Sequence, residues 1–168
     1  MLTRQVTAAL DRWDIKPDDS AGTPLQLSPP GRFLRHVADL FGTQLTGEAL
    51  LTLLKHPLCH SDNADRGDHL RLTHDLELDL RKYGPPFPTA DTLLGWASTR
   101  ADRQPWAQWV AELVTGLDTV GDKHLTDHLD AHLTLAESFC AGPALSGAGG
   151  LWAEAARREA QRICTDLP

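Results

Sequence analysis

The stretch PWAQWVAELVTGL, residues 105–117, decides the fold class of this chain. Its apolar residues follow the i, i+3, i+4, i+7, i+8, i+11 pattern of one helix face. They are Trp106, Trp109, Val110, Leu113, Val114 and Leu117. Pro105 stands where the first turn of a helix tolerates proline. The spacing therefore predicts a helix that buries one face against a core.

Similar apolar stripes on both sides of this stretch predict further helices. Ser28 and Thr46 are expected to cap two of them. Leu76, Leu78 and Leu80 alternate as a strand would, but the charged neighbours and the length of the segment favour a helix. The other helices are expected near residues 3–13, 29–41, 46–56, 70–83, 125–136 and 151–163.

The expected architecture is mainly α, with about seven or eight helices joined by breaks rich in proline and glycine. One or two short strands are allowed near the N-terminus. We divide the chain into residues 1–28, an N-terminal helix with an extended connector, and residues 29–168, a helical domain.

Composition narrows the class of protein. The chain has 168 residues, of which 41% are hydrophobic and 23% charged, as is normal for a chain that folds around a core. The net charge of −7 argues against a broad basic surface that wraps nucleic acid unaided. No apolar run reaches the ~20 residues of a membrane span, and the N-terminus lacks the apolar core of a signal peptide. We expect a cytoplasmic protein that does not enter a membrane.

The three cysteines form no CxxC pair, so neither a zinc ribbon nor a disulfide framework is indicated. Eight histidines raise the question of another metal site. His124, His128 and His132 share one helix stripe, but three ligands spread over ~12 Å of one helix cannot close on one ion. At most two of them, with a carboxylate such as Asp127, could bind a metal. A second group, which matches no compact zinc-ligand spacing, comprises His56, Cys59, His60, Asp62, His69 and His74. We interpret both groups as surface and loop polarity and assign no metal ligand.

Motifs for nucleotide binding and nucleophilic catalysis are incomplete. Residues 116–124 approach a phosphate loop, but Asp122 precedes Lys123, and no Ser or Thr follows the lysine. Residues 146–150 are rich in glycine but lack G-x-S-x-G. Helix capping and solvation explain the carboxylates Asp11, Asp14, Asp18, Asp19, Asp75, Glu77 and Asp79. We therefore assign no catalytic and no cofactor-binding residue, and we expect no cofactor.

Basic residues gather in three places, and there are tryptophans nearby in the sequence. Trp96, Trp106 and Trp109 could stack against a strand of DNA, but tryptophans at helical spacing are typical of a core, and we interpret them so. The basic groups are Arg66, Arg71, Arg81 and Lys82, then Arg100 and Arg103, and finally Arg157, Arg158 and Arg162.

Three segments come in one order with short spacers: DDSAGTPL at 18–25, PPGRFLR at 29–35 and LLTLLKHPL at 50–58. Together they resemble the middle of the bacterial double-strand break repair protein family AddB, whose members work with AddA in a helicase–nuclease complex. Leu76–Leu78, residues 81–87 and Leu151–Trp152 also look like that family. The resemblance runs from about Leu2 to Arg158.

The resemblance implies a fragment of a larger protein. AddB proteins have a superfamily-1-like helicase fold that is generally not a working motor, followed by a nuclease domain with an iron–sulfur cluster. Residues 1–28 resemble the start of the second helicase-like half, and the remainder resembles a helical subdomain. The nuclease carboxylates and the cluster cysteines of the family are not matched, so no residue here inherits a catalytic role. A DNA-contacting role is implied without an assignable residue, with an AddA-type subunit and DNA ends as partners.

Two other functions remain as alternatives. The histidine groups would suit a helical metal-dependent hydrolase, and the helices alone would suit an adaptor that binds another protein. Bound metal would distinguish the first of these from an AddB-type segment, and a neighbouring gene for an AddA-type helicase would argue against the second.

Overall fold

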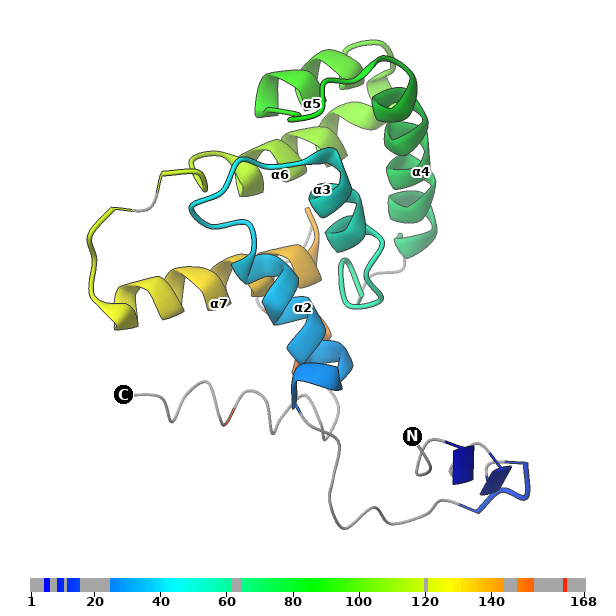
Figure 1. Cartoon of the computed structure of the whole chain (residues 1–168). Helices are drawn as coiled ribbons and strands as arrows, with labels where there is room; N and C mark the ends of the chain where they lie inside the picture. Colours follow the sequence, from blue (N-terminus) through cyan, green and yellow to red (C-terminus); the bar gives the residue numbers. More distant parts are fainter. Residues whose placement is uncertain are drawn as a thin grey trace.

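The computed structural model describes residues 5–6, 9–10, 12–15, 25–61, 65–119, 121–143, 148–152 and 162. These residues contain six α-helices and two short 3-10 turns, and no strand occurs among them (Figure 1). The mainly α prediction is confirmed. The elements are η1 (Leu25–Leu27), α2 (Pro29–Ala38), α3 (Gly47–Leu54), α4 (Arg66–Tyr83), α5 (Ala90–Ala97), η2 (Ala101–Arg103), α6 (Gln104–Val114) and α7 (Leu125–Ala141).

Side-chain caps start three of these helices. The Ser28 hydroxyl accepts a hydrogen bond from the backbone N–H of Gly31 at the start of α2, and Thr46 does the same for Ala49 in α3. Both predicted caps are confirmed. Thr89 and Thr92 form a reciprocal capping box at the start of α5. Each cap satisfies a backbone N–H that has no partner inside its helix.

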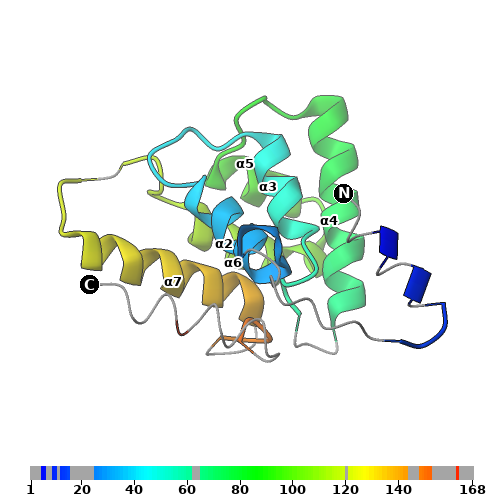
Figure 2. The same cartoon turned by 60° about the horizontal axis from the view of Figure 1, so that its bottom comes forward.

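The core lies where the helices meet. α5 packs on α6, α2 packs on both α3 and α7, and α4 packs on α3. Phe33, Leu50 and Phe139, from three different helices, are fully buried in one cluster. Figures 1 and 2 both show the loop after α3 lying between α2 and the start of α4. No helix among the described residues is long and apolar enough to cross a membrane.

The structure contains one helix that we did not predict, and it does not test the last predicted helix or the predicted division of the chain. α5 lies in a stretch where no helix was expected, between the break at residues 84–88 and α6. At the N-terminus the described residues Gln5, Val6, Ala9 and Leu10 are helical, as predicted. The predicted helix at 151–163 falls almost wholly outside the described residues, and the division at residue 28 stays a prediction.

Gly31 in the PPGRFLR segment is required by a close backbone contact. A Cβ at this position would lie 1.9 Å from the carbonyl oxygen of Leu25 and 2.6 Å from its carbon, both in the backbone of η1. The same carbonyl accepts a hydrogen bond of 2.6 Å from the Ser28 hydroxyl. The absence of a side chain at residue 31 therefore lets η1 fold back onto the first turn of α2.

Gly31→Ala is expected to destabilise the chain by about 1–3 kcal/mol, because η1 must move and the Ser28 cap is disturbed. Urea unfolding measures this change. Gly95→Ala is the matched control, since Gly95 lies in α5 with nothing within 4 Å of an added Cβ. That control should gain up to about 1 kcal/mol from helix propensity. Equal stability of the two variants would contradict the proposed role of Gly31.

Candidate nucleic-acid interface

His69 is a buried structural residue. Its Nδ1 accepts a hydrogen bond of 3.0 Å from the indole N–H of Trp106. The ring proton therefore lies on Nε2, which donates to the carbonyl oxygen of Leu54 at 2.7 Å. Burial lowers the pKa of His69 to about 4, so the ring is neutral at pH 7. Both ring nitrogens are used, and neither is available to a metal.

The rest of the predicted group around His69 does not converge on one point. His60 is buried with its ring 5.0 Å from that of His69, and it packs also on Trp109 at 5.9 Å. Burial, with a smaller effect of Cys140, raises the pKa of the Cys59 thiol well above its usual value. Asp62 lies outside the described residues. Within the described part of the chain, no three His, Cys, Asp or Glu side chains are placed to hold one metal ion.

The histidines of α7 have separate environments. His124 is the exposed residue before the helix, and His128 is half-buried. His132 Nε2 lies 2.8 Å from the carbonyl oxygen of Leu34, and its ring packs edge-on against Phe41 at 6.3 Å. His132 therefore joins α7 to α2.

The predicted tryptophan group belongs to the core. Trp96, Trp106 and Trp109 are 6%, 4% and 8% exposed. The guanidinium of Arg103 stacks over the Trp96 ring, 4.3 Å from its centroid. These indole faces are covered by protein, so they are closed to the bases of a DNA strand, and the interpretation as core is confirmed.

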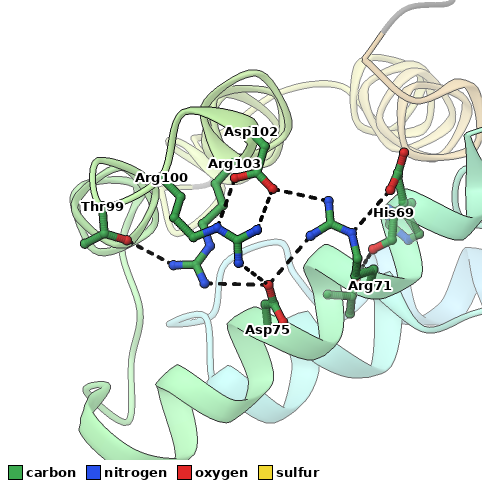
Figure 3. Close-up of polar contacts among 9 residues, drawn as sticks. His69, Arg71, Asp75, Thr99, Arg100, Asp102 and Arg103 are labelled. Carbon is green, nitrogen blue, oxygen red and sulfur yellow. Dashed lines mark hydrogen bonds and ion pairs between the residues drawn. The ribbon is translucent and has the colours of Figure 1, made fainter.

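Three of the predicted basic residues face carboxylates. Figure 3 shows Arg71, Arg100 and Arg103 around Asp75 and Asp102. Arg100 reaches Asp75 at 3.2 Å and Asp102 at 2.8 Å. Arg71 reaches Asp102 at 3.3 Å, and Arg103 reaches Asp75 at 3.6 Å. The network joins α4 to the turn before α6, and its arginines are neutralised within the protein.

A groove of about 720 Å³ lies between α3 and α4. Glu77, which is 8% exposed, accepts hydrogen bonds there from Lys55 at 2.5 Å and from Arg81 at 2.7 Å. One carboxylate thus takes up both cations. Lys55, Glu77 and Arg81 thus present paired charges in this groove.

A different set of basic residues remains on the surface, on three neighbouring elements. Arg32 and Arg35 on α2 are exposed, and His36 is half-buried. The His36 ring lies 6.2 Å from the ring of His56, which follows α3. Arg66 begins α4 and donates from Nη1 to a backbone carbonyl of the loop that follows α3. We call Arg32, Arg35, His36, His56 and Arg66 the basic face.

Positive charge accumulates on the basic face. Burial, followed by the charges of His36, Arg66 and Arg32, lowers the pKa of His56 to about 4. Among the described residues, Arg32 and Arg35 form no ion pair, because no carboxylate oxygen lies within 4.0 Å of either guanidinium group. At neutral pH His56 is therefore uncharged, and the positive charge of the face comes from Arg32, Arg35 and Arg66. Three arginines of like charge suit this face to an anionic partner.

Of these residues, Arg66 and His56 belong to groups predicted from the sequence, whereas the three on α2 do not. The signal was present, because Arg32, Arg35 and His36 stand at i, i+3 and i+4 beside the apolar stripe and so share a helix face.

Comparison with known proteins adds no relative: no protein-family model, no curated protein and no solved structure matches this chain.

Proposed function

We propose that this chain is a non-catalytic helical segment of an AddB-type subunit, in a cytoplasmic DNA helicase–exonuclease complex that processes double-strand breaks for recombinational repair. The segment acts as a scaffold, and it contacts DNA and an AddA-type subunit. It holds no cofactor in this proposal, and the chemistry belongs to other parts of the complex.

One observation carries the proposal. PPGRFLR and LLTLLKHPL, two of the segments on which the resemblance rests, form α2 and α3, which pack against each other. Arg32 and Arg35 of the first segment and His56 of the second belong to the basic face, where the ring of His36, next to Arg35, lies 6.2 Å from that of His56. The two segments on which the AddB resemblance rests therefore also share a positively charged surface, which suits DNA. The third segment, DDSAGTPL, lies almost wholly outside the described residues.

A non-catalytic role agrees with the environments of the candidate chemical groups. His69 is occupied on both nitrogens, burial favours the neutral thiol of Cys59, and Glu77 is paired with two cations. Catalytic groups need access to substrate and a poised proton or electron pair. These three side chains stabilise packing instead.

The test is association with partners. The 168-residue chain, carrying an affinity tag without histidines, is mixed with the AddA-type subunit encoded in the same genome and with a blunt-ended DNA duplex. Size-exclusion chromatography with light scattering should show a complex with the subunit or the DNA. A chain that associates with neither would contradict the proposal.

Metal content of the same preparation distinguishes the alternative. An AddB-type segment of this kind should contain no stoichiometric metal by plasma mass spectrometry. One equivalent of zinc or another transition metal would instead favour the helical hydrolase.

A further inference from the structure

We propose that the basic face binds the phosphodiester backbone of duplex DNA, without reading its sequence. This inference rests on the proposed function and deepens it, because it names the residues that make the DNA contact. The face comprises Arg32, Arg35, His36, His56 and Arg66, as defined above.

Availability of charge is the first argument. An arginine that already faces carboxylates gains little from a phosphate, because the ion pair must first be broken. Arg71 and Arg100 are in this position, each within 3.3 Å of an aspartate oxygen. Arg32 and Arg35 are exposed and have no such carboxylate among the described residues. Their guanidinium groups can therefore replace cations condensed on the DNA without first breaking an ion pair.

Geometry is the second argument. Arg32, Arg35 and His36 lie within four residues of α2, which is ~6 Å along a helix axis. Phosphates of one DNA strand follow each other every ~3.4 Å along the duplex axis, so these side chains can reach neighbouring phosphates of one strand. Arg66 comes from the start of α4 and carries the positive charge of the face beyond one helix.

The residues of the face suit contacts to phosphates. Trp96, Trp106 and Trp109 are buried, so they add no ring to this surface on which a base could stack. Contacts to phosphates position a protein on DNA but carry no sequence information. The chain as a whole has a net charge of −7, so its overall field repels DNA, and contact is favoured where positive charge is concentrated, as on this face.

Charge removal on the basic face provides the test. The probe is a fluorescent 20-base-pair blunt duplex. Its fluorescence anisotropy reports binding by the 168-residue chain and by the complex of the chain with the AddA-type subunit. The titrations are run between ~50 and ~200 mM salt. Arg32→Gln/Arg35→Gln should weaken binding about tenfold or more at low salt and reduce the salt slope by about 2. Two duplexes of unrelated sequence should lose affinity equally.

A matched control removes the same charge elsewhere. Lys82→Gln/Lys123→Gln changes two exposed lysines, at the end of α4 and before α7, and should change affinity less than twofold. Circular dichroism and thermal unfolding check that both variants keep the fold. All four positions are exposed, so a change of more than about 0.5 kcal/mol is not expected.

The outcomes separate the two proposals. If the complex with the AddA-type subunit forms but its DNA affinity is the same in both double variants, the basic face is not the DNA site while the proposed function stands. If the chain binds neither subunit nor DNA, the proposed function itself fails. If poly-glutamate competes as well as DNA at equal charge concentration, the face serves an acidic protein and the inference is overturned.

Discussion

His69→Leu is expected to lower the free energy of unfolding by about 3 kcal/mol, although leucine fills a similar space. The substitution leaves the Trp106 N–H and the Leu54 carbonyl buried without a partner, and each such loss costs about 1–3 kcal/mol. Leu54 is the last residue of α3, where the helix itself offers no donor to the carbonyl. The imidazole therefore caps α3 and anchors α6 at the same time.

Urea unfolding followed by tryptophan fluorescence measures this effect. His74→Leu is the control, since His74 is an exposed histidine on the same helix and its replacement should stay within about 0.5 kcal/mol. A double-mutant cycle with Trp106→Phe should give a coupling of about 1 kcal/mol or more. If His69→Leu is as stable as His74→Leu, the two hydrogen bonds contribute nothing to the fold.

Acid is expected to destabilise the protein between pH 6.5 and pH 4, well before most carboxylates are protonated. The folded-state pKa of His69 is about 4, against about 6.5 in the unfolded chain. Above pH 6.5 the ring is neutral in both states and contributes no pH dependence. Below pH 6.5 the unfolded chain binds a proton at this imidazole and the folded chain does not, so the free energy of unfolding falls until pH 4 is reached. The loss amounts to about 3 kcal/mol for His69.

His56 acts in the same direction, because burial and its cationic neighbours also lower its pKa to about 4. Its ring is only half-buried, so solvent screening reduces its share. Urea midpoints measured from pH 4 to pH 7.5 should fall on acidification, and His69→Leu should flatten the curve. A midpoint that is constant from pH 6.5 to pH 4.5 would contradict the buried neutral state of His69.

The helices that the sequence predicts well are those with long periodic stripes. α6 follows its stripe because five apolar residues at helical spacing, from Trp106 to Val114, form one face that is stable only when buried. Leu117, the sixth residue of the predicted stripe, lies in the turn after the helix. α5 was missed because eight residues hold only two turns of pattern, with Leu93, Trp96 and Ala97 buried. Its start was visible in principle from Thr89 and Thr92, whose side chains form the capping box.

The roles of the polar residues were much harder to predict. Spacing along the chain grouped His56, His60 and His69, yet His69 finds its partners at Leu54 and Trp106. The same limit applies to charge. Helix spacing places Asp68 next to Arg71, but Arg71 also meets Asp102, which is 31 residues away in the sequence. No local pattern specifies this second contact.

The sequence by itself therefore determined the class of fold, the stripes that enter the core and the caps that start α2 and α3, because these depend on neighbours within one or two helical turns. Only the tertiary structure decided which arginines stay without a carboxylate partner among the described residues. It also decided that His69 is the histidine that is buried and joins α3 to α6 by hydrogen bonds. Those outcomes depend on distances between helices that are remote in sequence, and electrostatic and hydrogen-bond energies change steeply over such distances. The basic face, assembled from α2, the loop after α3 and α4, exists only because those elements pack together.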